Sequence, residues 1–265
     1  MSARVLAGWR GVLMLAMAAA WGLAPVRSAQ ADLVVTGTRF IYPAGQKSLT
    51  LRTGNAGQHP ILVQSWLDSG DFTADPSRET VPFLLTPPVF RLDPTGRMSL
   101  LLRHTGEPMP KDRESVFWIN FLEVPARDPS QKNLLQLAVR LRMKVLYRPE
   151  GLPGSASEAI GKVAWTYHAA DREIEAHNET PYFVSLAQVE LAAEVESAVG
   201  SGSPATPITL TGLTVAPLAR TRFSLPAGAA PRVGEAALRY YAANDDGEIL
   251  EAMTALRQAN TRGTQ

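Results

Sequence analysis

Residues 133–144 alternate in polarity. From Leu135 onward every second residue is a large apolar one, and the residues between them are Gln136, Ala138, Arg140, Arg142 and Lys144. Because successive side chains of a strand point to opposite sides, this pattern predicts a β-strand with one apolar and one cationic face. Two interpretations of the apolar face stay open here. It packs on the chain's own core, or it is held for a partner at a sheet edge, where free backbone groups invite pairing while the charges give solubility.

The rest of the first half also favours short strands. Gly and Pro occur 20 times each in the 265 residues and supply many turns. Strands are predicted at residues 32–42, 47–53, 61–67, 89–92, 98–103, 116–124 and 134–147. Residues 93–96 (Asp-Pro-Thr-Gly) predict a hairpin turn. Seven strands with this turn spacing are typical of an immunoglobulin-like sandwich.

A second domain is predicted after a linker at residues 149–154, which holds two prolines and two glycines. Strands are predicted at residues 162–167, 182–191, 208–213, 220–225 and 236–241. Residues 248–258 fit either an amphipathic helix, with Ile249, Met253 and Leu256 on one side, or a last strand. The sequence thus predicts two β domains, residues 32–151 and 152–265.

The first 31 residues have the pattern of a secretory signal peptide. Arg4 and Arg10 precede a mostly apolar run from Val12 to Ala24, and Ala29 and Ala31 provide small residues for cleavage after position 31. The run of about 13 residues is shorter than the roughly 20 that a spanning helix needs. No later segment is apolar enough to span, so no stable membrane insertion is expected.

Charge and cysteine content exclude several classes of function. Beyond residue 31 the chain has 23 basic and 25 acidic residues, which argues against nucleic-acid binding. Residues 32–151 carry 15 basic and 12 acidic groups, and residues 152–265 carry 8 and 13, so the first half is better suited to an anionic ligand. The absence of cysteine excludes disulfides, a thiol nucleophile and thiolate metal sites.

No motif of catalysis or cofactor binding is present. The four histidines have no metal-ligand spacing, and neither a GxSxG elbow nor a complete phosphate loop occurs. Asn178-Glu179-Thr180 fits the glycosylation pattern, but Pro181 disfavours modification. We therefore expect no enzyme activity, no metal and no cofactor.

Several segments together resemble a known family. They are residues 37–43, 86–88, 113–120, 133–144 and 143–149 in the first half and, more weakly, 178–183 and 244–247 in the second. The chain resembles periplasmic pilus (fimbrial) assembly chaperones of the PapD-like family. The resemblance implies an all-β protein of two immunoglobulin-like β-sandwich domains joined at an angle.

The resemblance also implies a function in the periplasm. Pilus subunits of such systems lack the last strand of their own sandwich, and the chaperone lends them a long edge strand before an outer-membrane usher receives them. By position Leu135, Leu137 and Val139 match the residues that fill the subunit's groove, with Leu141 as a candidate fourth. Self-association of the free protein is left open.

Two cations match the family's anchor for the subunit's C-terminal carboxylate, namely Arg39 and Lys144. A chain terminus is a fixed anion, so two partly desolvated cations would set the register of the inserted strand. Lys144 has the opposite parity from Leu135, Leu137 and Val139, so it should point away from the apolar row unless a bulge intervenes.

Other matched positions are expected to be structural. Glu114, Arg148 and Asp245 match a charged set near the domain interface, where Asp246 is an equal alternative to Asp245. Pro87 matches a position that carries a cis peptide in the family.

Two other functions stay open from the residues alone. One is a secreted sandwich that binds another ligand, such as an adhesin-like module, although Trp165, Tyr167, Tyr240 and Tyr241 are predicted in strands and not in loops. The other is a secreted hydrolase with a dispersed site.

Overall fold

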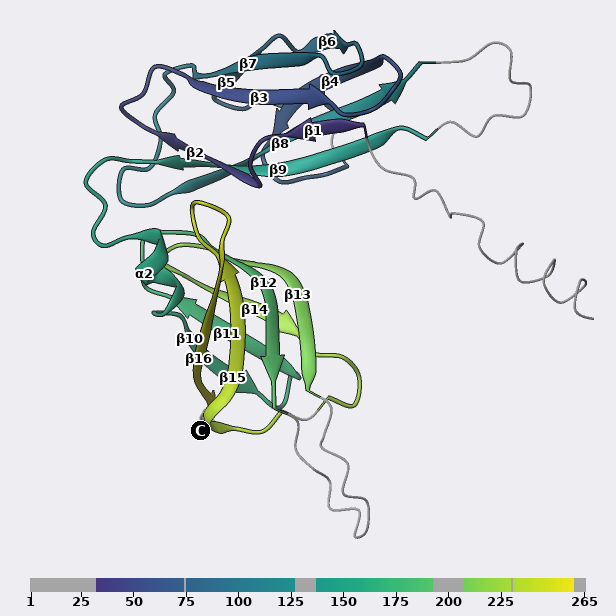
Figure 1. Cartoon of the computed structure of the whole chain (residues 1–265). Helices are drawn as coiled ribbons and strands as arrows, with labels where there is room; N and C mark the ends of the chain where they lie inside the picture. The colour runs from purple at the N-terminus through teal and green to yellow at the C-terminus, as the bar shows by residue number, and fades with distance from the viewer. Residues whose placement is uncertain (1–31, 74, 127–136, 193–206, 230, 260–265) are drawn as a thin grey trace, which may run out of the picture. The chain divides into compact units, whose positions relative to one another are not determined.

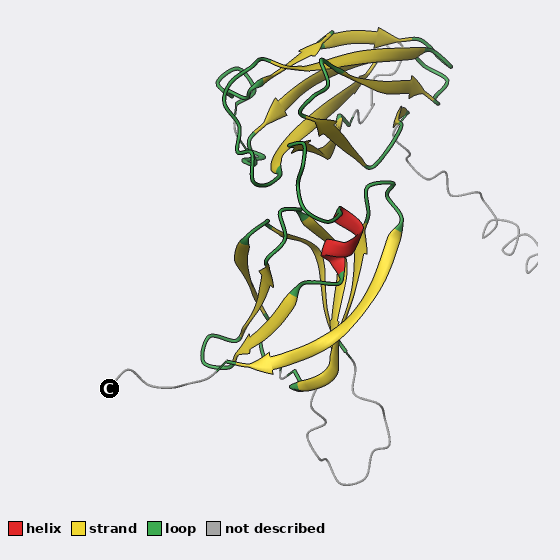
Figure 2. Cartoon of the chain, turned by 90° about the vertical axis from the view of Figure 1, so that its left-hand side faces the viewer, coloured by secondary structure: helices red, strands yellow, loops and turns green. Residues whose placement is uncertain are grey.

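The computed structural model describes residues 32–73, 75–126, 137–192, 207–229 and 231–259 (Figure 1). Within these residues it contains strands β1 to β16 and one short helix, α2 (Figure 2). The prediction of an all-β protein is confirmed. The predicted signal peptide, residues 1–31, and Leu135 of the alternating segment lie outside the described residues.

The first half of the chain forms two sheets. The four-stranded sheet has the order β1-β3-β7-β5, with β1 at Leu33–Val35, β3 at Leu49–Asn55, β7 at Arg97–His104 and β5 at Phe83–Thr86. The five-stranded sheet has the order β2-β9-β8-β4-β6, with β2 at Arg39–Pro43, β9 at Val139–Arg148, β8 at Ser115–Pro125, β4 at Ile61–Asp68 and β6 at Val89–Leu92. Apolar side chains of both sheets meet in one buried core, which confirms the predicted sandwich.

The chain changes sheets within the first predicted strand. Residues 32–42 were expected to form one strand, but β1 pairs with β3 of one sheet and β2 pairs in parallel with β9 of the other. Gly37 lies between them with φ of 103°, a value that residues with a Cβ rarely adopt. Residues 33–35 and 39–43 both have the composition of a strand, so the apolar pattern alone could not show that the chain passes from one sheet to the other between them.

The turn at residues 93–96 forms but does not close a hairpin. The Gly96 N–H donates to the Asp93 carbonyl at 2.8 Å. The strands on either side belong to different sheets, since β6 pairs with β4 while β7 lies between β3 and β5. The hairpin prediction is wrong, because turn chemistry shows where a chain reverses and not which sheet receives the next strand.

Two strands are absent from the sequence prediction. Strand β5 has four residues and lies between Pro82 and Pro87, and prolines so close together favour the prediction of a loop. Strand β11, Glu173–Asn178, is rich in polar residues. The Thr86–Pro87 peptide is cis, as the resemblance implies.

The second half forms one seven-stranded sheet around its own core. The order is β13-β12-β15-β16-β10-β11-β14, with β13 at Ile208–Val215, β12 at Val184–Leu191, β15 at Gly234–Ala243, β16 at Ile249–Gln258, β10 at Ala164–His168 and β14 at Ala219–Ser224. Strands β13 and β14, the two ends of this order, follow each other in the chain, and side chains of both, such as Val215 and Phe223, pack on the same core. We refer to this half as the second sandwich. Helix α2, Ala156–Ile160, follows the predicted linker and is capped by Ser155, whose hydroxyl accepts from the Glu158 N–H at 3.2 Å.

The last segment is a strand and not a helix. In β16 Leu250, Ala252 and Leu256 pack on the core, whereas Ile249 and Met253 are exposed. The helical stripe of Ile249, Met253 and Leu256 therefore does not form. The burial follows a period of two, which β16 needs because it pairs with β15 on one side and with β10 on the other.

The alternation within β7 predicts opposite effects for two neighbouring leucines. Leu100 is fully buried and Leu101 points to the surface. We expect Leu100→Ala to lower the free energy of unfolding by about 2–5 kcal/mol, because it leaves a cavity. Leu101→Ala should lower it by ~1 kcal/mol or less. Urea unfolding followed by circular dichroism measures both, and equal losses would contradict the register.

Candidate functional site

Strand β9 has a neighbouring strand on both sides along only part of its length. It pairs with β8 from Val139 to Tyr147, but β2 pairs with it only from Lys144 to Arg148. Within the described residues, positions 139–143 of β9 therefore have no strand on their second side, and β9 extends past β2 in Figure 1. This leaves a row of backbone N–H and C=O groups open to pairing.

The apolar row is exposed where it enters β9 and buried at its end. The strand predicted from residue 134 begins later, because residues 137 and 138 are described but are not in β9. Leu137, two residues before β9, is 63% exposed, and Val139 is half-buried. Leu141 and Met143 are also partly buried, and they pack against the core of the first sandwich. Leu141, the candidate fourth residue of the row, is thus partly used by its own domain, which leaves Leu137 and Val139 as its accessible described members.

Arg39 and Lys144 lie beside each other because they are register partners in the parallel pairing of β2 with β9. The Lys144 Nζ donates to Ser185 Oγ at 2.8 Å and to Thr214 Oγ1 at 2.6 Å. The Arg39 Nη1 donates to the Ala243 carbonyl at 2.8 Å. Arg39 Nε is buried and has no hydrogen-bond partner.

Both cations are partly desolvated and lack a counterion. Among the residues that the structure describes, no ion pair joins either of them to a carboxylate. Burial, with repulsion from Arg39 as a smaller cause, lowers the pKa of Lys144 to about 8. Burial likewise lowers the pKa of Arg39, although Asp245 and Glu114 act in the opposite direction. A bound anion would relieve both effects, so this pair has the electrostatics of an anion site.

Lys144 follows the predicted parity. The pairing of β8 with β9 runs from Val139 to Tyr147 without a register shift. Lys144 lies over the ring of Trp118 at 5.4 Å, on the same face as Arg142, which lies over that ring at 4.1 Å. The cations of β9 therefore occupy the face opposite to Leu137 and Val139.

The second predicted charge set forms one connected cluster. Arg148 Nε donates to Glu114 Oε1 at 2.6 Å, and its two terminal nitrogens donate to the Asp245 carboxylate at 2.6 and 2.8 Å. Glu114 Oε2 accepts from the Phe183 N–H at 2.7 Å. Burial raises the pKa of Glu114 despite these donors. Asp245, and not Asp246, is the member of the cluster, and it links the first sandwich to the second.

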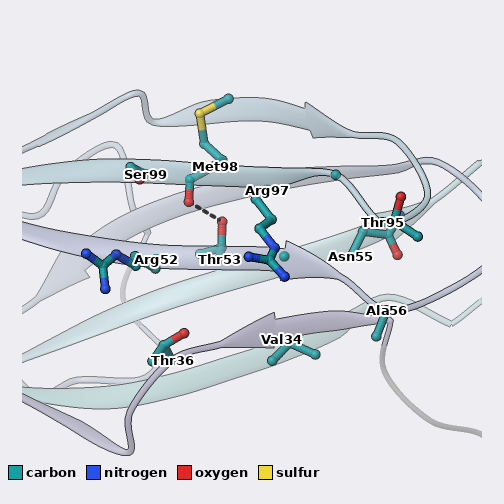
Figure 3. A pocket seen from close by; sticks show the side chains of 12 residues that line it. Val34, Thr36, Arg52, Thr53, Asn55, Ala56, Thr95, Arg97, Met98 and Ser99 are labelled. Carbon is teal, nitrogen blue, oxygen red and sulfur yellow. Dashed lines mark hydrogen bonds between the residues drawn. The ribbon is translucent and has the colours of Figure 1, made fainter.

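Other features of the described residues do not add a site. No group of three or more His, Asp or Glu there could hold a metal ion, and no helix there is long and apolar enough to cross a membrane. A hollow lies on the outer side of β1, β3 and β7, where Arg52 and Arg97 face solvent and Thr53 Oγ1 donates to the Met98 carbonyl at 3.2 Å (Figure 3). Its lining includes no residue of β2 or β9.

The sequence did not indicate which polar groups surround the two cations. The hydroxyls of Ser185 and Thr214 and the Ala243 carbonyl come from three strands of the second sandwich, and no local pattern connects them to β9. Trp118 lies within the matched segment 113–120, yet its place under Lys144 requires the register of β8 with β9.

Two family models match the chain. The model described as "Pili and flagellar-assembly chaperone, PapD N-terminal domain" matches residues 32–153, and that described as "Pili assembly chaperone PapD, C-terminal domain" matches residues 158–253. The chain belongs to the PapD-like pilus assembly chaperones. This family consists of assembly chaperones and not of enzymes, so the hydrolase and the adhesin-like module are set aside.

Individual relatives agree with this assignment. "Chaperone protein FimB/FhaD" of Bordetella pertussis is 37% identical over 260 residues, which cover 95% of this chaperone and 99% of that protein. "Probable fimbrial chaperone YadV" of Escherichia coli is 46% identical over 173 residues, 63% of this chaperone and 70% of that protein.

Solved structures of pilus chaperones share the fold. The crystal structure of the YadV chaperone matches with a TM-score of 0.69 at 37% identity, and it covers 85% of this chaperone and all of that chain. A chain from the complex of Salmonella enterica SafA pilin with the SafB chaperone matches with a TM-score of 0.67 at 28% identity, and it covers 86% of this chaperone and 98% of that chain.

The low pKa of Lys144 predicts an observable titration. ¹³C NMR of the lysine Cε atoms should show the Lys144 signal titrating with a midpoint near pH 8. Arg39→Ala should raise this midpoint, because it removes a repelling charge, whereas Arg39→Lys should leave it nearly unchanged. A wild-type midpoint at the ordinary value of 10.5 would contradict the described burial.

The charge cluster predicts unequal costs for its members. Arg148→Met should lower the free energy of unfolding by about 3–5 kcal/mol, because it leaves the buried Glu114 carboxylate without a cation. Asp245→Asn should cost ~1 kcal/mol or less, because the Asp245 side chain is 36% exposed. Urea unfolding of the two variants provides the measurement, and a larger loss for Asp245→Asn would refute this ranking.

Proposed function

We propose that this chaperone captures pilus subunits in the periplasm by lending them the edge of β9, a donor-strand complementation, and then delivers them to an outer-membrane usher. The observation that carries the proposal is the edge of β9 at residues 139–143, which has no second strand within the described residues, beside the exposed Leu137 and the half-buried Val139. SafB, which shares the fold, forms a complex with a pilin.

Two kinds of contact would hold the subunit. Its incomplete sandwich would pair its backbone with β9, which adds affinity without depending on the subunit's sequence. Leu137 and Val139 would enter its open groove, each contributing about 1.5–3 kcal/mol of gross burial energy. Leu135 precedes them at the same parity and would extend the row. Much of this energy offsets the costs of ordering and association.

The subunit's C-terminal carboxylate would bind between Arg39 and Lys144. A carboxylate there would supply the counterion that neither cation has among the described residues, and charge-assisted hydrogen bonds would hold it. Because the terminus is a fixed point of the subunit chain, this contact would set which subunit residue faces Val139.

The remaining features take supporting roles in this proposal. The Glu114–Arg148–Asp245 cluster would fix the second domain against the first, with the domain boundary at Gly151. Residues 1–31 would direct export to the periplasm and be removed. The same open margin would allow two free chaperones to associate through β9.

Co-expression with a pilus subunit and co-purification of the complex from periplasm test this function. Leu137→Arg should reduce the captured subunit at least about tenfold, because it places a charge in an apolar groove. Leu84→Arg is the matched control, since Leu84 is also exposed but lies on β5 of the other sheet. Its yield of complex should equal that of the wild type.

The carboxylate role has its own variants. Arg39→Ala and Lys144→Ala should each lose the complex while the fold, followed by circular dichroism, is retained. A subunit without its C-terminal carboxylate, made with an amidated terminus, should bind wild-type chaperone more weakly. Normal capture by the Arg39→Ala/Lys144→Ala double variant would overturn this assignment.

A further inference from the structure

A buried carboxylate lies on the same side of the sheet as the cations of β9. Strands β9, β8 and β4 are neighbours, and the register aligns Arg142 with Asn120 and Trp66, and Lys144 with Trp118 and Asp68. Cross-strand partners share a face, so all these side chains lie on one side of the sheet. Asp68 is 1% exposed although it ends β4.

Five polar contacts hold the Asp68 carboxylate. Arg142 donates to it through Nη2 at 2.5 Å and through Nε at 3.2 Å, and Arg140 Nη2 lies 3.6 Å away. The Asn120 Nδ2 donates at 2.7 Å and the Gly70 N–H at 2.8 Å. Burial alone would raise the pKa of Asp68, but the hydrogen bonds from Arg142, Asn120 and Gly70 outweigh it and lower the pKa.

The two arginines extend this contact across three strands. Arg140 donates to Asn120 Oδ1 at 2.9 Å and to the Phe72 carbonyl at 2.7 Å, and Arg142 donates to the Gly70 carbonyl at 3.0 Å. Each guanidinium also lies over an indole ring, Arg140 over Trp66 at 5.0 Å and Arg142 over Trp118 at 4.1 Å. The half of β9 without a second strand is thus tied by side chains to β8, β4 and the loop after β4.

Asp68 also separates the cations of β9 into two groups. Arg140 and Arg142 share the single negative charge of Asp68, whereas the hydrogen-bond partners of Lys144 in the described residues are the hydroxyls of Ser185 and Thr214. Among the described residues of this face, Lys144 and its neighbour Arg39 are therefore the cations without a carboxylate partner.

We propose that Asp68 is a positioning residue for β9, the strand that would be lent to a subunit. Through its contacts with Arg140 and Arg142, Asp68 holds residues 139–143 of β9 in place against β8 and β4. Leu137 and Val139 are then presented to a subunit, and the anion site consists of Arg39 and Lys144. The proposal rests on the proposed function for its consequence, but the positioning itself is measurable in the free chaperone.

Hydrogen–deuterium exchange of the mature protein tests the positioning. Asp68→Asn should speed exchange of those amides within residues 139–143 that bond to β8 by about tenfold or more, the lower end expected for losing hydrogen bonds to a charged group. Amides of Ile61 and Val63, which are buried in β4 of the same sheet and do not pair with β9, should exchange as in the wild type. Unchanged exchange in β9, or equal acceleration throughout the sheet, would overturn the proposal.

A double-mutant cycle with Asp68→Asn and Arg142→Gln identifies the contact. The two effects on β9 exchange should be non-additive, with the double variant close to either single one. The matched control is Asp93→Asn with Arg91→Gln, an ion pair on neighbouring β6 whose side chains are 68% and 67% exposed. That cycle should be additive and leave β9 unchanged.

Two further measurements keep the outcome decisive. If Asp68→Asn does not fold, Arg140→Gln and Arg142→Gln, which alter the partly exposed partners, should show the same local acceleration, and its absence refutes the proposal. Subunit capture by Asp68→Asn should fall about tenfold with the loss of positioning. Failure of the proposed function would appear instead as normal capture by the Arg39→Ala/Lys144→Ala variant, which leaves the exchange result standing.

Discussion

The parallel pairing of β2 with β9 stops at Lys144, and the remainder of the structure depends on this boundary. On one side of it β9 is an interior strand whose residues Val145 and Tyr147 belong to the core. On the other side it is an edge strand whose backbone can accept another chain. Lys144 and Arg39 lie where this pairing ends, so the end of the β2–β9 pairing coincides with two cations that have no carboxylate partner among the described residues. An inserted strand would continue the sheet from the point where β2 leaves it.

The two charge clusters at the boundary of the sandwiches differ in completeness. Arg148 has two carboxylates, and one of them, Glu114, also accepts a backbone N–H, so this cluster is satisfied without any ligand. Arg39 and Lys144 have carbonyl and hydroxyl partners but no carboxylate within the described part of the chain. A satisfied cluster suits a structural contact, and an unsatisfied one suits recognition, since only the second gains from an incoming anion.

The sequence was informative where a pattern is local. Alternation located β9, turn residues bounded most strands, and the resemblance selected Arg148 and Lys144 before any geometry was available. It failed where pairing decides. The turn at residues 93–96 joins strands of different sheets. Residues 248–258 fitted both a helix and a strand, and pairing with β15 and β10 decides for the strand. No local sequence pattern identifies Asp68, since its contact with Arg142 depends on the register that places both side chains on one face of β4, β8 and β9.

The change of sheet at Gly37 has a consequence for how the protein avoids closing upon itself. Extending the parallel register of Arg39 with Lys144 backwards would place Val34 opposite Val139. A straight amino-terminal strand would therefore cover the very margin that β9 leaves open. The left-handed backbone at Gly37 sends that strand to β3 instead, at a conformation that costs glycine little and other residues more. Gly37 thus directs the amino-terminal strand away from residues 139–143 of β9, so that the chaperone does not cover this edge with its own chain.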